Sequence, residues 1–305
     1  MIKVISFFKI EHCNPVYQVS ASENKFSKEL HQKTVSSITV YDERERSAIT
    51  FLLLEYILGI EKSDVLANKE IAVSHLKREE LEEAIDRINQ GEPVQYITGK
   101  TQFLNLTFKV NPSVLIPRPE TEELVDIIIK ENKGRKGLRI MDMGTGSGCI
   151  AVSLAYNLPE AEVLAVDISK SALYVAAENA SINHAKVTFV NDDILNLAET
   201  NSTKLDVIVS NPPYVRYSEK KEMQKNVLEY EPKLALFVDD HEALIYYEKI
   251  AQFSARHLEN GGLLYLEINE MLGKETAALV GSFGFNNIEI KDDLFGRPRF
   301  IRCSK

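Results

Sequence analysis

The residues best suited to chemistry are Asn211-Pro212-Pro213-Tyr214, which follow the apolar run 207–209. The run predicts the end of a strand that is buried on both faces, and the two prolines stop that strand because they have no N–H to donate. The exposed groups are then a side-chain amide, a proline carbonyl and an aromatic ring, which suit a planar amide or amino group as ligand. The same four residues are also compatible with an ordinary turn, so their context has to decide.

A second group, Gly144-Thr145-Gly146-Ser147-Gly148, lies between a predicted strand at 138–143 and a predicted helix. Glycines at alternate positions let the backbone turn sharply and let a ligand approach main-chain atoms. The Gly-x-Gly-x-Gly spacing is one residue shorter than the dinucleotide fingerprint. It therefore points away from a nicotinamide cofactor.

Acidic residues end the next two predicted strands. Asp167 follows Gly148 by 19 residues, a position from which a carboxylate can accept hydrogen bonds from ribose hydroxyls. At the end of the third strand, Asp193 can accept from an adenine amino group while Ile194 covers the ring. A lone acid can equally cap a helix or lie in a solvated turn, which we prefer for Asp192. The ordered set predicts a nucleoside site across the first three strand ends.

Strand and helix patterns alternate from residue 137 onward and predict an α/β fold. Short apolar runs occupy 138–143, 163–167, 187–190, 207–210 and 263–268. Helical patterns occupy 148–157, 170–182 and 241–258. This alternation predicts a parallel sheet covered on both faces, which 288–290 and 299–303 are expected to close.

Helical patterns dominate residues 26–89, whereas residues 1–24 show no period and are expected to form an irregular lead-in. One helix is expected to end at Gly59 and another to be capped by Ser74. The faces expected to be buried on these two helices are Ala48, Phe51, Leu52, Tyr56 and Ile57 on the first, and Leu81, Ala84, Ile85 and Ile88 on the second. The remaining charges indicate a solvated surface, one side of which could meet a protein partner.

A β-hairpin is predicted between the helical part and the α/β part. Apolar and polar residues alternate over 104–110, the two-residue period of a half-buried strand. Asn111-Pro112-Ser113 is expected to turn the chain, and 114–116 to return it. Pro119 suits the first turn of the helix that follows.

The composition limits the class of protein. The chain has 305 residues, 44% hydrophobic and 27% charged, enough for one large or two ordinary globular domains. Its three cysteines lie far apart, as is typical of reduced thiols in a cytoplasm, and its six histidines show no metal-ligand spacing. No apolar run approaches the roughly 20 residues that span a bilayer. The net charge of −9 argues against a general nucleic-acid binder, although a local basic patch stays compatible with it. We therefore expect a cytoplasmic protein without a bound metal.

The motifs together resemble a known class of enzyme. The glycine loop, the two acids and Asn-Pro-Pro-Tyr, in this order, resemble the S-adenosylmethionine-dependent methyltransferases that modify planar nitrogen groups. The segments 91–99, 115–122 and 230–236 narrow the resemblance to the protein-(glutamine-N5) methyltransferases called PrmC or HemK, over about residues 26–303. This family methylates the glutamine of the Gly-Gly-Gln loop in class 1 peptide chain release factors, which are therefore the expected partners.

The resemblance implies a specific architecture. A seven-stranded S-adenosylmethionine-dependent methyltransferase domain of Rossmann-like α/β fold is expected after a small helical domain and a linking β-hairpin. The expected segments are a lead-in at 1–24, a helical substrate-docking domain at 25–92, a hairpin linker at 93–118 and a catalytic domain at 119–305.

The resemblance also implies roles for single residues. Those expected to hold S-adenosylmethionine, and its product S-adenosylhomocysteine, are Gly144, Thr145, Gly146, Ser147, Gly148, Asp167, Asp193, Ile194 and Asn211. Those expected to hold the glutamine amide are Asn211, Pro212, Pro213, Tyr214 and, as a pocket wall, Phe103. Among them, Asn211 and Pro212 supply the two oxygen acceptors that aim the nitrogen at the methyl group, and Tyr214 fixes the plane of the amide.

Two other functions stay open at this point. An adenine-N6 methyltransferase acting on DNA or RNA would present a similar amino group to Asn-Pro-Pro-Tyr, but it needs a base-flipping module with phosphate-binding cations. The second alternative is a protein that binds the cofactor but does not transfer the methyl group. We interpret an Arg118–Glu120 pair, Glu267 and Cys149 as structural.

Overall fold

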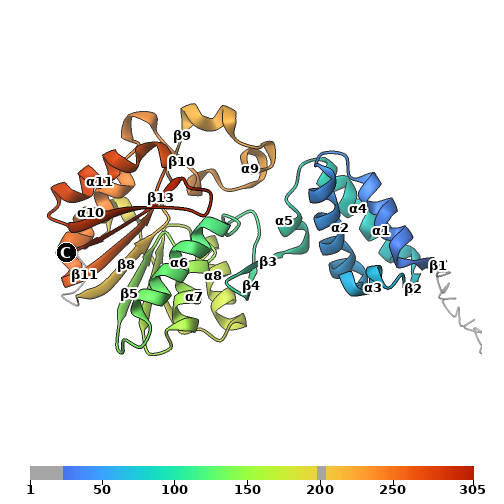
Figure 1. Ribbon diagram of the computed structural model, residues 1–305, viewed down its shortest axis with the longest axis horizontal. Helices are drawn as coiled ribbons and strands as arrows, with labels where there is room; N and C mark the ends of the chain where they lie inside the picture. Colours follow the sequence, from blue (N-terminus) through green and yellow to red (C-terminus); the bar gives the residue numbers. More distant parts are fainter. Residues whose placement is uncertain (1–22, 198–203) are drawn as a thin grey trace, which may run out of the picture. The chain divides into compact units, whose positions relative to one another are not determined.

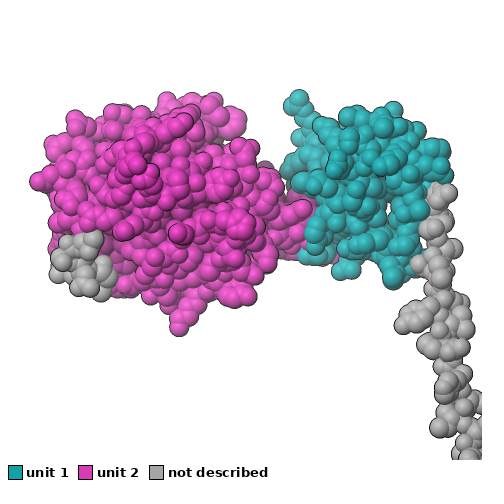
Figure 2. All heavy atoms as spheres, turned by 90° about the horizontal axis from the view of Figure 1, so that it is seen from below, with its two compact units in different colours: residues 1–89 teal, residues 90–305 magenta. Residues whose placement is uncertain are grey.

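The computed structural model describes residues 23–197 and 204–305 (Figure 1). The chain divides into two compact units, Met1–Asn89 and Gln90–Lys305, which Figure 2 distinguishes by colour. The expectation for the lead-in falls mostly on residues 1–22, which lie outside the described residues.

The first unit consists of helices and one short antiparallel strand pair. The helices are α1 (Ser27–Ser37), α2 (Glu43–Leu58), α3 (Lys62–Leu66) and α4 (His75–Asn89). The strands are β1 (Glu23–Phe26) and β2 (Glu70–Val73), which pair antiparallel. Residues 23 and 24, expected to be irregular, therefore belong to a strand.

The two predicted helix ends of this unit are confirmed, but one predicted face is wrong. Gly59 ends α2 with a φ of 66°, and the Ser74 Oγ accepts a hydrogen bond from the Lys77 N–H at the start of α4. The buried face of α4 is the predicted one. On α2, however, Leu52 and Tyr56 are 47% and 46% exposed, and the buried residues are Ile49, Thr50, Leu53, Leu54 and Ile57. Three consecutive leucines make more than one face of α2 apolar, so periodicity alone does not select the inner one.

The predicted hairpin is present, with different strands. It pairs β3 (Lys100–Phe103) with β4 (Leu106–Lys109) after the short helix α5 (Val94–Thr98). Leu104 and Asn105 form the turn with φ values of 47° and 62°, as two-residue hairpin turns require. The alternation over 104–110 therefore straddles a turn. The expected return strand at 114–116 is irregular backbone.

The second unit is built on a seven-stranded mixed sheet in the order β12-β13-β11-β8-β5-β6-β7 (Figure 1). The strands are β5 (Arg139–Met143), β6 (Glu162–Asp167), β7 (Val187–Asn191), β8 (Leu205–Ser210), β11 (Leu258–Glu267), β12 (Asn286–Asp292) and β13 (Pro298–Ser304). From β7 to β11 the neighbours are parallel, whereas β13 runs antiparallel to β11 and β12. The predicted fold class is confirmed.

Helices cover both faces of this sheet. The long helices are α6 (Pro119–Asn132), α7 (Cys149–Asn157), α8 (Lys170–Ile182), α10 (Ile245–His257) and α11 (Gly273–Ser282). One apolar core packs α6 and α7 against strand residues such as Ile140 and Val207. The other packs α10 and α11 against their strand neighbours, Met141 and Ile208. Successive strand residues thus enter opposite cores, which explains the continuous apolar runs in the sequence.

The strand order places two motifs side by side. From β5 the chain continues to β6 and β7 on one side, and then crosses to β8 on the other side. Ligands of open α/β sheets bind outside the carboxyl ends of the strands at such a switch point. The glycine loop follows β5 and Asn211 follows β8, so both motifs lie at this point.

Shorter elements border the same edge. The strands β9 (Val215–Arg216) and β10 (Phe237–Val238) pair in parallel and enclose a segment of short helices. Those helices are η2 (Tyr217–Glu222), α9 (Lys225–Tyr230) and η3 (Lys233–Ala235). The remaining short helices are η1 (Ile194–Asn196), η4 (Asp240–Glu242) and η5 (Glu270–Leu272).

The described residues include neither a helix that could span a membrane nor a cluster of metal ligands. None of the helices in 23–197 and 204–305 is long and apolar enough to cross a membrane. Within the same ranges, no group of three or more His, Cys, Asp or Glu side chains could hold a metal ion.

Candidate active site

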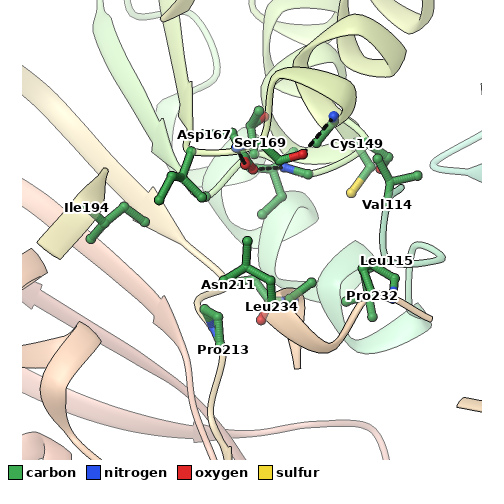
Figure 3. Close-up of a pocket in the computed structure, with 18 of the residues that line it drawn as sticks. Val114, Leu115, Cys149, Asp167, Ser169, Ile194, Asn211, Pro213, Pro232 and Leu234 are labelled. Carbon is green, nitrogen blue, oxygen red and sulfur yellow. Dashed lines mark hydrogen bonds between the residues drawn. The ribbon is translucent and has the colours of Figure 1, made fainter. Parts of the chain in front are cut away.

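A cavity of about 270 Å³ lies at the carboxyl ends of β5 and β8. Figure 3 shows Asp167 and Ser169 on one side of it and Asn211 and Pro213 on the opposite side, with Ile194 at one end. The predicted residues that line it are Gly144, Thr145, Gly146, Ser147, Asp167, Asp193, Ile194, Asn211 and Pro213. The structure therefore brings the glycine loop, the two acids and the start of Asn-Pro-Pro-Tyr around one space.

The glycine loop turns sharply after β5. The amides of Gly144 and Thr145 both donate to the Val166 carbonyl, at 2.8 and 3.0 Å. Gly146 has a φ of 54° and open space where a Cβ would stand. Gly148 does not line the cavity, and a Cβ there would lie 2.9 Å from the Cβ of Ala176 in α8. Its role is to let α7 and α8 approach each other.

Asp142 stabilises this loop through hydrogen bonds from Thr145 and Ala151. Its side chain is fully buried, and its Oδ2 accepts from the Thr145 hydroxyl at 2.6 Å and from the Ala151 N–H at 3.2 Å. Its Oδ1 has no hydrogen-bond partner among the described residues. Burial raises the pKa of Asp142 to about 7.

Asp167 lies where the sequence predicted it, at the end of β6. Its Oδ2 accepts from the Gly146 N–H and its Oδ1 from the Ser169 N–H, each at 2.8 Å. Burial raises its pKa, and these two hydrogen bonds oppose the rise. Each carboxylate oxygen keeps one further lone-pair direction, with which it can accept from a ligand hydroxyl.

Asp193 and Ile194 border the other end of the cavity. Asp193 accepts from the Leu195 N–H at 2.9 Å and from the Asn196 side-chain amide at 2.8 Å. The Ile194 Cδ1 atom would lie 3.3 Å from a Cβ on Gly144, so these two residues form one continuous wall. The wall offers apolar surface beside a carboxylate.

Asn211 is held by a residue of α6. Its Nδ2 donates to the Thr121 hydroxyl oxygen at 3.1 Å, and that hydroxyl donates to Glu267 Oε2 at 2.7 Å. The Tyr214 hydroxyl donates to the other oxygen of Glu267 at 3.0 Å. Burial raises the pKa of Tyr214 well above its usual value, as does the nearby Glu267 charge. One buried carboxylate thus supports both Asn211 and Tyr214.

Besides Gly148, three other predicted residues do not border the cavity. Pro212 is buried, and Tyr214 is half-buried and packs beside the second core. Phe103 is 1% exposed and meets Phe108 edge to face inside the first core. The Phe103 ring therefore does not line this cavity, because the hairpin uses it for its own packing, and its expected role as a pocket wall stays a prediction.

The segment 113–118 lines the cavity, although the sequence analysis assigned it no such role. Val114, Leu115 and Pro117 line the cavity, and the Val114 carbonyl accepts from the Tyr96 hydroxyl at 2.7 Å. The prediction that Arg118 pairs with Glu120 is wrong, because the Arg118 guanidinium binds Glu231.

Sequence reasoning missed several lining residues besides these. They are Thr121, Cys149, Ile150, Ile168, Ser169, Ala172, Leu195, Pro232, Leu234, Ala235 and Tyr246. The motifs at 115–122 and 230–236 contain four of them, Thr121, Pro232, Leu234 and Ala235, so these two motifs were a usable signal. Burial raises the pKa of the Cys149 thiol to about 12, which keeps it protonated and supports its interpretation as a packing residue.

Comparison with known proteins agrees with this geometry. Residues 29–99 match the family model of the PrmC N-terminal domain, and residues 121–233 match that of the methyltransferase small domain. A protein of Flavobacterium psychrophilum named release factor glutamine methyltransferase is 46% identical over 269 residues, which cover 87% of this chain and 94% of that protein. The chain belongs to the PrmC/HemK family. A relative of the same name from Bacteroides thetaiotaomicron is 43% identical and covers 87% of this chain and 95% of its own length.

This PrmC/HemK member also resembles solved structures. The structure of the Thermus thermophilus 16S rRNA N2 methyltransferase RsmC, in complex with AdoMet and guanosine, aligns with a TM-score of 0.50 and 19% identity. The alignment covers 68% of this chain and 49% of that one. At this identity the likeness establishes the fold alone.

Proposed function

We propose that this chain transfers a methyl group from S-adenosylmethionine to the side-chain amide nitrogen of the glutamine in the Gly-Gly-Gln motif of class 1 peptide chain release factors. The observation that carries the proposal is the match over 87% of the chain to relatives named release factor glutamine methyltransferase. A cavity flanked by a nucleoside-type wall and by Asn211 supports it from the geometry. A partner that acts in translation would also place the chain in the cytoplasm.

The residues around the cavity fit S-adenosylmethionine. Asp167 keeps acceptor directions for two ribose hydroxyls, and Asp193 with Ile194 offers an acceptor and an apolar surface for adenine. The open space at Gly146 admits the methionine part beside main-chain atoms. When bound, the cofactor supplies a methyl group that the positive sulfonium already activates.

Asn211 and Pro212 would bind the glutamine. An amide nitrogen is a poor nucleophile because its lone pair is delocalised, so the site must align it with the methyl carbon. The Asn211 Oδ1 and the Pro212 carbonyl can accept from the glutamine NH₂ and direct that lone pair. Positive charge develops on the nitrogen during transfer, so both acceptors bind the transition state more strongly than the ground state.

Tyr214 would keep the glutamine amide in plane. Its hydroxyl donates to Glu267, so the ring is held from its far end and would serve for stacking and not for proton transfer. The raised pKa of this hydroxyl supports the same division of roles. Pro213, which lines the cavity, would contribute apolar contact that excludes water.

Mass spectrometry of a class 1 release factor tests the proposal. After incubation with the chain and S-adenosylmethionine, the Gly-Gly-Gln peptide should gain the mass of one methyl group on the glutamine. Duplex DNA in a parallel reaction tests the alternative of an adenine-N6 methyltransferase. A methyl label that appears in the DNA and not in the release factor would reject the proposal.

We also propose that the helical part of the chain binds the release factor outside its Gly-Gly-Gln loop. The proposed division keeps residues 25–92 for docking, 93–118 as linker and 119–305 for catalysis. Deletion of residues 1–89 should weaken methylation of the whole factor much more than methylation of a short Gly-Gly-Gln peptide. Equal losses on both substrates would argue against docking by this unit.

A further inference from the structure

The buried hydrogen bonds behind Asn211 connect it to two residues with no assigned role. Thr121 lies in the first turn of α6 and Glu267 is the last residue of β11. We propose that Glu267, acting through Thr121, fixes the direction of the Asn211 side-chain amide, so that Asn211 presents its Oδ1 to the substrate. Both are positioning residues, and the inference rests on the proposed function.

The direction follows from counting protons. An ionised carboxylate only accepts hydrogen bonds, so each hydroxyl that contacts Glu267 must donate to it. Thr121 has a single hydroxyl proton, and its bond to Glu267 Oε2, at 2.7 Å, uses it. The Thr121 oxygen can therefore only accept from its second neighbour, Asn211 Nδ2 at 3.1 Å.

This arrangement leaves one group of Asn211 for the ligand. With Nδ2 bound to Thr121, the Oδ1 is the atom available to accept from a glutamine NH₂. An Asn211 amide turned by half a rotation would present its own NH₂ instead, and two donors would then face each other. The charge of Glu267 thus selects which planar group the site binds.

The same carboxylate also ties Tyr214 into the arrangement. Glu267 is 1% exposed, and its Oε1 accepts from the Tyr214 hydroxyl at 3.0 Å. One buried residue therefore aligns the acceptor and the stacking ring together. Hydrogen bonds that stabilised only the fold would not require both hydroxyls, those of Thr121 and Tyr214, to donate to the same carboxylate.

Replacement of Thr121 tests the inference. Thr121→Val keeps the shape of the side chain and removes the hydroxyl, and it should lower kcat for release factor methylation roughly 10- to 100-fold through misplacement of the acceptor. Thr121→Ser restores the hydroxyl and should recover most of the kcat. Affinity for S-adenosylmethionine, measured by calorimetry, should change much less than kcat in both variants.

Thr276→Val is the matched control. Thr276 is also fully buried in this unit, and its hydroxyl donates to the carbonyl of Leu272, the residue before α11, at 2.8 Å and away from the cavity. Its replacement removes a buried hydroxyl as well, and it should lower the melting temperature without changing kcat. Equal kcat in Thr121→Val and the wild type, or no recovery in Thr121→Ser, would overturn the inference.

Glu267→Gln gives a second, pH-dependent readout. Burial raises the pKa of Glu267, and the hydrogen bonds from Thr121 and Tyr214 and the Arg299 charge oppose the rise. The ionisable groups that act on it are Arg299, Glu120, Tyr214, Tyr247 and Cys149. Protonation of Glu267 at acid pH would release the Thr121 proton, so kcat should fall on the acid side in the wild type. Glu267→Gln should have a low kcat without this acid limb, and an unchanged pH profile would contradict the inference.

A readout without turnover separates this inference from the proposed function. A wild-type chain that leaves the release factor unmethylated would reject the function. The Asn211 Nδ2 hydrogens, followed by NMR in an isotope-labelled chain, would then decide the inference. They should exchange slowly with solvent in the wild type and faster in Thr121→Val, whereas equal rates would overturn it.

Discussion

Arg118 and Glu231 form an ion pair in which Arg118 Nη2 lies 2.6 Å from Glu231 Oε1. The other oxygen of Glu231 accepts from the Ile116 N–H at 3.2 Å. The Glu231 side chain is 1% exposed, whereas that of Arg118 is 32% exposed. This pair fastens two segments that both line the cavity, 113–118 and the residues after Glu231.

Arg118→Ala should destabilise the second unit. Removal of Arg118 leaves the Glu231 carboxylate buried with a single hydrogen bond. Breaking a fully buried pair costs on the order of 3 kcal/mol, and because Arg118 is partly exposed we expect a loss of about 2 kcal/mol in the free energy of unfolding. The midpoint of urea unfolding should fall accordingly. Lys225→Ala is a suitable control, because its pair with Glu229 is exposed and should contribute little. Equal midpoints in the two variants would contradict the structural role of the Arg118 pair.

Gly148→Ala and Gly146→Ala should have different effects. An alanine at 148 would be strained at a φ of 81° and would meet Ala176 Cβ at 2.9 Å, at a cost on the order of 2 kcal/mol or more. An alanine at 146 meets nothing within 4 Å, so strain of about 1 kcal/mol remains. Thermal unfolding without ligand measures this difference.

The same pair of variants separates packing from binding. Because Gly146 lines the cavity, Gly146→Ala should weaken S-adenosylmethionine binding although it lowers the melting temperature only slightly. Calorimetric titration checks this order. A larger loss of binding in Gly148→Ala at temperatures where both variants are folded would show that the packing assignment is wrong.

The sheet and the loops that border the cavity were predictable from the sequence because the residue patterns that mark them are local. Apolar runs mark the strands, and glycine or proline must follow them where the chain turns, as at Gly144 and Pro212. The hairpin register was less predictable, since the alternating pattern continues through Leu104 and Asn105 although the chain reverses there. Positive φ at Leu104 is stabilised by the fold and not by residue type.

The supports of the site could not be predicted for a different reason. Thr121 and Glu267 stand far apart in the chain, and each has an ordinary local explanation, one in a helix start and the other at a strand end. Their contact depends on how α6 packs beside β11. Tertiary geometry of this kind leaves no periodic signal in one sequence.

Asp142→Asn should change how stability depends on pH. Burial raises the pKa of Asp142 from 3.8 to about 7, so the folded chain holds this proton at pH values where the unfolded chain has lost it. Stability from this group is therefore present at low pH and is lost as the pH rises toward 7, by up to about 4 kcal/mol. Asparagine does not titrate. The variant should exceed the wild type in stability at about pH 8, and the difference should shrink toward about pH 5. Urea unfolding across this range measures it, and a constant difference would argue against the raised pKa.

Asn211→Ala should abolish methyl transfer while leaving cofactor binding nearly intact. The substitution removes the Oδ1 acceptor that we propose binds the nitrogen most strongly when its positive charge develops, and loss of one such group costs on the order of 100- to 1,000-fold in kcat. The larger contacts that we propose for the nucleoside are with Asp167 and Asp193, which also line the cavity, so the affinity for S-adenosylmethionine should change little.

Asn211→Asp sharpens the same test. Aspartate keeps the size of the side chain but has no N–H to donate to Thr121, whose own proton is bound to Glu267. The carboxylate at 211 and the buried Glu267 carboxylate would then compete for one hydroxyl proton, so this variant should also lose transfer although it retains an oxygen acceptor. Transfer of labelled methyl to a release factor, with calorimetry for the cofactor, checks both variants. Turnover by Asn211→Ala close to that of the wild type would show that the substrate amide binds elsewhere, because the acceptor would then not be needed.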